Sequence, residues 1–218
     1  MTAVIDHVLL AVRDLDSAAS WIREQHGLTA LPGGRHPGAG TANRIVPLGD
    51  DYLELIAVVD RDEAAASPLR ERLAAAPETG AVLATWAVRV TDLDALKQRL
   101  GDAGVATEGP LPGSRLRPDG VLLEWRTLRV GSGLEPVIPF FIEWKIDADQ
   151  HPGATPVEHP AGAVLLRGIR LASPNPEALA DRLRIVLDEG VDYQVEAGES
   201  EQPVAVVLSV NGEERDLP

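Results

Sequence analysis

The hydrophobic pattern of the first residues changes from strand-like to helix-like within a short distance. The apolar run from residue 3 to residue 12 has the length of a strand, and the polar step after it opens a stretch with helical periodicity. Asp14 or Asp16 can accept hydrogen bonds from the first free N–H groups of this helix, and Gly27 can end it in the left-handed conformation. The pattern therefore predicts a strand that leads into an amphipathic helix.

The same order of elements returns later in the chain. HVLLAVRDLDSAASWIREQHGL (7–28) and TWAVRVTDLDALKQRLGDAGV (85–105) each read as a strand, a D-L-D step and an amphipathic helix that closes at a glycine. Strand-like segments follow each helix, and each series ends with a glutamate inside an apolar strand, Glu54 in one copy and Glu143 in the other. The chain therefore carries two copies of a β-α-β-β-β unit.

Two such units in tandem predict an α+β protein. We expect the first βαβββ module over residues 1–60 and the second over residues 82–147. A linker at 61–81 should carry a short helix from about Pro68 to Ala76. Residues 148–218 read as strand, helix and two strands, which predicts a partial third βαββ unit at the C-terminus.

The composition excludes several classes of protein and several kinds of site. The 218 residues are 44% hydrophobic and 25% charged, as in ordinary soluble proteins, and no apolar run has the length of a membrane-spanning helix. Cysteine is absent, which excludes disulfides, thiolate zinc sites and thiol nucleophiles. The formal charge of −14 disfavours nucleic acid as a partner. We expect a cytoplasmic protein that acts on neither nucleic acid nor membrane.

Five stretches resemble the glyoxalase-like domain proteins of the vicinal-oxygen-chelate superfamily, which includes glyoxalase I, extradiol dioxygenases and bleomycin-resistance proteins. They are IDHVLLAVRDLD, GGRHPGAGTANRIVPLGDDYLELIAV, RLRPDGVLLEW, PFFIEW and HPGATPVEHPAG. The second stretch is the most specific of the five, because several Gly, His, Thr and Asn positions recur in order. The resemblance implies that the two modules form one curled mixed sheet around a central cleft, and that the protein, a monomer or homodimer, acts on a small molecule. It implies the reaction only weakly.

In that superfamily the inward-facing residues of the first and last strands ring a metal ion. The resemblance places these positions at His7, Glu54, Thr85 and Glu143. It thus implies His7, Glu54 and Glu143 as ligands of one divalent ion, Zn, Ni, Mn or Fe, and no nucleotide cofactor. Threonine is a poor ligand, so the site either has three protein ligands or has lost its metal. Two alternatives stay open: His7 as a satisfied core residue, and Glu143 in an ion pair with a nearby arginine.

Other residues are candidates for substrate binding. His36 and Asn43 belong to a glycine-rich stretch in which backbone can approach a ligand, and the resemblance favours a role for them in the cleft. Arg115 and Arg117 can hold an anionic group of a substrate, because guanidinium matches carboxylate and phosphate. Trp125 can form part of the cleft wall, and the alternative is a position in the hydrophobic core.

These residues favour a glyoxalase-like enzyme, a divalent-metal-assisted lyase or isomerase that acts on a small oxygenated, anionic substrate. Glu54 or Glu143 would be the catalytic base. The first alternative is a metal-free small-molecule binding protein, of the sequestration or resistance kind. A second is an extradiol-type dioxygenase, for which the second histidine of the iron site falls at Thr85. A third is an interaction domain that inherited the fold. His151 and His159 form no metal motif that we can assign.

Overall fold

The first module follows the predicted order of one strand, one helix and three strands. The protein is described by a computed structural model that covers residues 3–65, 67, 69–131 and 134–217. The elements of the module are β1 (Val4–Ala11), α1 (Leu15–His26), β2 (Leu31–His36), β3 (Thr41–Pro47) and β4 (Tyr52–Val58). Asp14 caps α1 by accepting a hydrogen bond from the Ser17 N–H at 2.8 Å, and Gly27 ends the helix with φ of 67°.

The second module repeats this order after the linker. Two short helices form in the linker, α2 (Arg61–Ala64) and α3 (Arg70–Ala74), and α3 lies within the range expected for one helix. Pro68, the expected first residue of that helix, lies outside the described residues. The elements of the module are β5 (Val82–Arg89), α4 (Leu93–Asp102), β6 (Thr107–Leu116), β7 (Leu122–Val130) and β8 (Phe140–Trp144).

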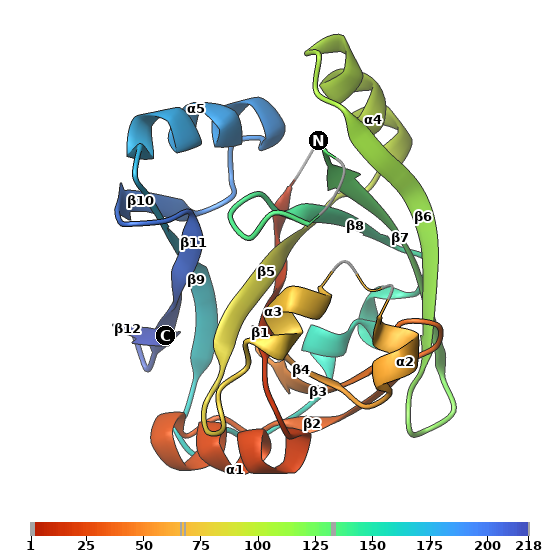
Figure 1. Ribbon diagram of the computed structural model, residues 1–218. Coiled ribbons are helices and arrows are strands. Elements are labelled where there is room, and N and C mark those ends of the chain that lie inside the picture. Colours follow the sequence, from red (N-terminus) through yellow and green to blue (C-terminus); the bar gives the residue numbers. More distant parts are fainter. Residues whose placement is uncertain (1–2, 66, 68, 132–133, 218) are drawn as a thin grey trace.

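The strands of both modules join one sheet in the order β2-β3-β4-β1-β5-β8-β7-β6. β1 and β5 pair antiparallel at the junction of the modules, while β4 and β8 pair parallel to β1 and β5, respectively. The sheet curls until its edge strands β2 and β6 meet, so that a Cβ added to Gly34 would lie 2.7 Å from the Leu116 carbonyl oxygen. The predicted fold class is confirmed (Figure 1). The division into separate domains at residues 60, 81 and 147 stays a prediction.

The C-terminal part forms a second sheet that packs against the first. Its strand order is β10-β9-β11-β12, and Figure 1 shows it beside β5. The elements are β9 (Val164–Ser173), α5 (Pro176–Val186), β10 (Tyr193–Ala197), β11 (Gln202–Val210) and β12 (Glu213–Leu217). The pattern of residues 148–218 predicted strand, helix and two strands, and β12 is an additional strand. One hydrophobic core joins this unit to both modules.

Strand alternation gives the curled sheet two different faces. On the convex face, Leu10 and Leu53 are fully buried against the helices and the second sheet. On the concave face, His7 of β1 and Glu54 of β4 project into the curl from neighbouring parallel strands. Among the described residues no helix is long and apolar enough to cross a membrane, and the longest, α1, has 12 residues.

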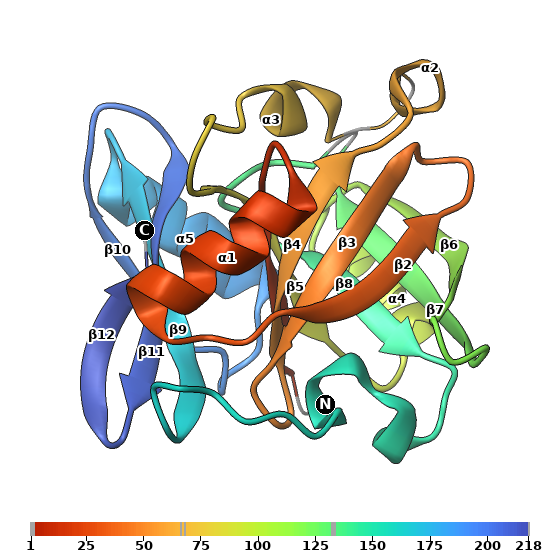
Figure 2. The same ribbon diagram turned by 90° about the horizontal axis from the view of Figure 1, so that it is seen from below.

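The two ends of the curled sheet are covered by different segments. α2 and α3 lie together at one end, at the top of Figure 2, and residues 148–154 lie at the other. α2 approaches the sheet over the turn between β2 and β3, where Gly40 has φ of 63° and its carbonyl oxygen accepts hydrogen bonds from the N–H groups of Val59 and Asp60. A Cβ on Gly40 would lie 2.4 Å from the Ala64 nitrogen, so only glycine fits beneath α2.

We therefore expect Gly40→Ala to destabilise the protein. The new methyl group would be strained at positive φ and would also collide with the backbone of α2, with a combined cost above about 2 kcal/mol. The measurement is urea unfolding at neutral pH. Gly38→Ala is the matched control, because Gly38 has φ of 75° but a Cβ added there would meet nothing within 4 Å. Equal losses in the two variants would contradict a role for the close contact.

Candidate functional site

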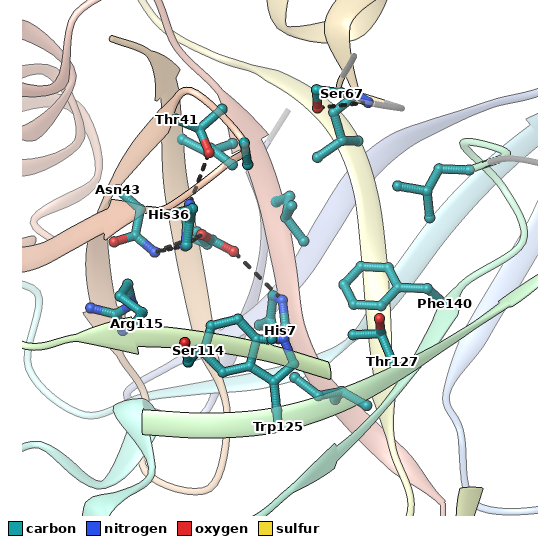
Figure 3. A pocket seen from close by; sticks show the side chains of 18 of the residues that line it. His7, His36, Thr41, Asn43, Ser67, Ser114, Arg115, Trp125, Thr127 and Phe140 are labelled. Carbon is teal, nitrogen blue, oxygen red and sulfur yellow. Dashed lines mark hydrogen bonds and ion pairs between the residues drawn. The ribbon is translucent and has the colours of Figure 1, made fainter. Parts of the chain in front are cut away.

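The concave face of the sheet encloses a cavity of about 300 Å³. Figure 3 shows side chains from both modules pointing into it. Six of the residues predicted for the site lie on its wall: His7, His36, Asn43, Glu54, Arg115 and Trp125. Glu143 and Arg117 are absent from this wall.

The centre of the site is shaped by an irregularity in β1. The pairing of β1 with β5 shifts between Ile5 and His7, so Asp6 is the extra residue of a β-bulge. The bulge brings the Asp6 carboxylate beside the His7 ring, with 2.6 Å between Oδ1 and Nδ1. Asp6 is completely buried.

Two further groups donate hydrogen bonds to Asp6. Trp144 Nε1 and His151 Nε2 each lie 3.0 Å from Oδ2. His151 Nε2 carries the proton, because its Nδ1 accepts the Gly153 N–H at 3.1 Å. Burial by itself raises the pKa of Asp6, but the hydrogen bonds from His151 and His7 outweigh it and hold the pKa well below its ordinary value. Asp6 is therefore a buried, ionised carboxylate.

The ionised Asp6 fixes the orientation of His7. Because Nδ1 donates to Asp6, Nε2 points into the cavity, 3.6 Å from Oε2 of Glu54. The His7 ring stacks on Tyr52, with 4.5 Å between centroids and 11° between planes, and Phe140 meets it edge-on at 5.7 Å. His7 is thus held on both faces and at one nitrogen, and its other nitrogen is directed at Glu54.

Glu54 is held through its other oxygen. Asn43 Nδ2 donates to Oε1 at 2.6 Å and also lies 3.3 Å from His36 Nε2. His36 Nδ1 lies 2.9 Å from Thr41 Oγ1, and burial lowers the pKa of His36. This network is consistent with a neutral His36 that donates through Nδ1 and accepts at Nε2. Oε2 of Glu54 is left facing His7 and the cavity.

Glu143 does not join this cluster. The cavity-lining residues of β8 are Phe140, Ile142 and Trp144, so the strand period of two places Glu143 on the opposite face. There Arg126 Nε donates to its carboxylate at 2.9 Å and Lys145 Nζ at 2.5 Å. Partial burial raises the pKa of Glu143, but these donors outweigh it and lower the pKa. The structure therefore does not bring Glu143 together with His7 and Glu54. It contains the alternative, an ion pair of Glu143 with an arginine.

The two arginines expected to bind substrate also separate. Arg115 lines the cavity and is buried, whereas Arg117 lies outside it and pairs with Asp119 at 2.6 Å. Trp125 is part of the cavity wall, edge-to-face with Trp144 at 5.3 Å between centroids. A Cβ on Gly113 would lie 2.4 Å from Trp125 Nε1, so this glycine leaves space for the indole.

Several residues of the site were not predicted from the sequence. They are Asp6, Tyr52, Phe140, Trp144 and His151. The pair Asp6 and His7 inside an apolar strand is a signal that could have been noticed, because two adjacent polar residues in such a strand break its alternation. His151 carries no comparable signal, since its contact with Asp6 spans 145 positions of the chain.

A curled sheet of two β-α-β-β-β modules with a polar cavity on its concave face defines the vicinal-oxygen-chelate class of proteins. The sequence model of one family of this class, described as the glyoxalase-like domain, matches residues 5–187. The chain therefore belongs to the glyoxalase-like domain family. Members of this class are small-molecule enzymes or binding proteins, and the match does not define a particular activity.

Two solved structures are similar to the chain. A hypothetical protein from Staphylococcus aureus is 16% identical, with a TM-score of 0.77 over 95% of this chain and 91% of that chain. A methylmalonyl-CoA epimerase from Streptomyces coelicolor, in complex with 2-nitronate-propionyl-CoA, is 20% identical, with a TM-score of 0.48 over 65% of this chain and 97% of that chain. No curated protein matches the chain significantly. The first likeness extends the shared fold to the C-terminal sheet.

Proteins of this superfamily commonly use a divalent metal, but the donors of this cavity do not fit one. His7 Nε2 and Glu54 Oε2 face each other, while Glu143 lies on the other face of the sheet. Thr85 is fully buried, its hydroxyl has no hydrogen-bond partner among the described residues, and it does not line the cavity. Within the described part of the chain no group of three or more His, Cys, Asp or Glu residues could hold a metal ion. The iron site of an extradiol dioxygenase needs two histidines and a carboxylate, and Thr85 stands where the resemblance places the second histidine.

We expect Asp6→Asn to lower the free energy of unfolding by about 3–5 kcal/mol at neutral pH, because an amide cannot accept from all three donors around it. The folded-state pKa of Asp6 lies below its ordinary value of 3.8, so its stabilisation is present above that pH and is lost as the pH falls below it. The difference in free energy of unfolding between wild type and Asp6→Asn should therefore become smaller at acid pH.

Urea unfolding between pH 3 and pH 8 measures this difference. Asp119→Asn is the control, because Asp119 is exposed and pairs only at the surface with Arg117. A loss in Asp6→Asn that is no larger than that of the control, or that does not change with pH, would contradict an ionised Asp6.

Proposed function

We propose that the protein is an enzyme of the lyase or isomerase type that removes a proton from a small oxygenated substrate, with Glu54 as the base. The observation that carries the proposal is the position of Glu54. It is the one carboxylate among the described residues that line the cavity, and its Oε2 is directed at the ligand space beside His7. A base must lie within reach of the proton that it takes, and Oε2 meets that condition for a molecule in this cavity.

The chemistry divides between Glu54 and His7. When Oε2 takes a proton from a carbon next to a carbonyl group, the C–H bond breaks and its electron pair moves onto the carbonyl oxygen as an enolate. His7 Nε2 lies 3.6 Å from Oε2, close enough to exchange that proton through a small shift or a substrate hydroxyl. Asp6 stabilises the imidazolium that forms, because its carboxylate contacts Nδ1. Return of the proton to another substrate atom gives an isomerase, and delivery to a leaving group gives a lyase.

The rest of the cavity supports this assignment. Asn43 holds Oε1, so one oxygen of Glu54 stays anchored while the other reacts. The aromatic wall formed by Tyr52, Phe140 and Trp125 restricts water and strengthens the electrostatic interactions inside. The proposal needs no metal ion for any of its steps, in keeping with the donor set.

A metal-free binding protein is the second candidate. It is favoured by the extent to which the polar residues already hold each other, since Asn43, His36 and Thr41 form a continuous network before any ligand enters. A preorganised cavity of this kind suits tight binding as well as catalysis. The two candidates differ in one observable, the exchange of a carbon-bound hydrogen.

We expect Glu54→Gln to abolish proton transfer and Glu143→Gln to preserve it. Small 2-oxo acids, 2-hydroxy acids and uncharged hydroxyketones would be incubated with the protein in D2O, and incorporation of deuterium at carbon would be followed by NMR. Loss of a positioned base costs about a hundredfold or more in rate, whereas Glu143 lies outside the cavity in an ion pair. Glu143→Gln is therefore the matched control of the same chemistry.

Equal exchange in wild type and Glu54→Gln would contradict the proposed base. Exchange that appears only after addition of Zn, Ni, Mn or Fe would contradict the metal-independent form of the mechanism. Binding of a ligand without any exchange would favour the second candidate.

A further inference from the structure

Arg115 lies between two cavities inside the curled sheet. Its side chain lines both the main cavity and a second cavity of about 250 Å³, whose wall includes Pro152 and Thr155. Arg115 is only 4% exposed, and its Nη1 is buried without a hydrogen-bond partner among the described residues. Arg126 on the neighbouring strand β7 pairs with Glu143, and Arg117 pairs with Asp119.

An unpaired guanidinium in such a place is costly. Burial lowers the pKa of Arg115, and the nearby charge of Glu54 offsets this only in part. A buried donor without an acceptor forfeits the hydrogen bonds that it would make in water. A hydrogen-bond acceptor that carries negative charge would therefore stabilise the buried Arg115 side chain.

A second unsatisfied group lies next to it. Asn43 Oδ1 is buried and accepts no hydrogen bond from the described residues. The Nδ2 of the same amide is held by Glu54 and His36. Consecutive glycines on β2 make room for both groups: a Cβ on Gly33 would lie 2.0 Å from Asn43 Oδ1, and a Cβ on Gly34 would lie 3.1 Å from Cγ of Arg115. Figure 3 shows both side chains on the same side of the cavity. Asn43 Oδ1 packs against Gly33, which is not part of the main cavity wall, so of these two groups Arg115 is the one left to meet a ligand.

We propose that the substrate is a small carboxylic acid with an apolar, preferably aromatic, body. Its carboxylate binds Arg115, and its body packs against Trp125 and Phe140. Arginine matches this role because its planar fork binds a carboxylate through two N–H groups. The aromatic wall suits the apolar part of the substrate because flat apolar groups pack on aromatic rings.

This inference rests on the proposed function, because it takes the cavity of Glu54 as the substrate site. The carboxylate on Arg115 and the proton acceptor on Glu54 lie on the same wall, so one small molecule can reach both. The experiment therefore measures binding separately from proton transfer, in a protein whose base has been removed.

The test is titration calorimetry on Glu54→Gln with three probes: mandelate, phenylacetate and methyl mandelate. We expect mandelate and phenylacetate to bind, and methyl mandelate to bind at least about tenfold more weakly than mandelate because it lacks the carboxylate. Adding Arg115→Met to this background should reduce mandelate binding about tenfold to a hundredfold and leave methyl mandelate unchanged.

Two further variants keep the result interpretable. Arg115→Lys retains the charge but not the fork, so it should bind mandelate between the parent and Arg115→Met. Arg117→Met is the matched control, because Arg117 already pairs with Asp119 and does not line the main cavity. Removal of a buried, unpaired charge should leave Arg115→Met folded, with a melting temperature no lower than that of its parent, which thermal unfolding checks.

The proposal is overturned if neither carboxylate binds at millimolar concentration, if methyl mandelate binds as tightly as mandelate, or if Arg115→Met binds mandelate unchanged. Failure of the proposed function gives a different result. In that case mandelate binding depends on Arg115, but wild type exchanges no carbon-bound hydrogen. Exchange that depends on Glu54 in uncharged substrates alone would retain the proposed function and reject the carboxylate.

Discussion

A carboxylate that is completely buried stays ionised only when N–H groups surround it, and the site depends on how Asp6 meets this condition. Its donors come from three places: His7 beside it on β1, Trp144 on the last strand of the second module, and His151 beyond that strand. The same carboxylate therefore joins the two modules and sets the orientation of the imidazole. Stability and the candidate chemistry are coupled at this residue.

The two modules use matched glutamates for different purposes. Glu54 projects into the cavity, where Asn43 holds one oxygen and leaves the other facing His7. Glu143 projects from the opposite face and is neutralised by Arg126 and Lys145. A duplicated unit thus supplies one acidic group to the cavity and one to the outer surface of the sheet. This asymmetry leaves Glu54 as the one carboxylate among the described residues that line the cavity.

The glycine pair of β2 has a part in the same arrangement. Gly33 and Gly34 are at the edge of the curled sheet, where β2 meets β6, and side chains there would displace Asn43 and Arg115. Because Gly33 and Gly34 carry no side chains, the edge strands approach closely, and the side chains of Asn43 and Arg115 fit beside them. The cavity can therefore hold a buried cation close to a buried base.

The sequence was sufficient for the modules and for part of the site. Alternation and the repeated D-L-D step predicted both β-α-β-β-β units, and the resemblance to a known family implied that His7 and Glu54 share one cleft. The pairing of their strands is seen only in the structure. Glu143 was wrongly expected in the cavity because equal places in a repeat do not guarantee equal faces, and a shift of one position reverses a strand residue. The bulge at Asp6 and its contact with His151 depend on tertiary packing, which no local pattern encodes.

The central claim is that Asp6 holds His7 with its proton on Nδ1 and its Nε2 directed at Glu54. Long-range ¹H–¹⁵N correlation spectra of the histidine rings measure this directly, because the two ring nitrogens of each neutral tautomer have distinct shifts and coupling patterns. A His7→Gln variant identifies the signals of His7 among the five histidines. At alkaline pH the account predicts that the neutral His7 ring carries its proton on Nδ1. A neutral His7 ring protonated at Nε2 would contradict it.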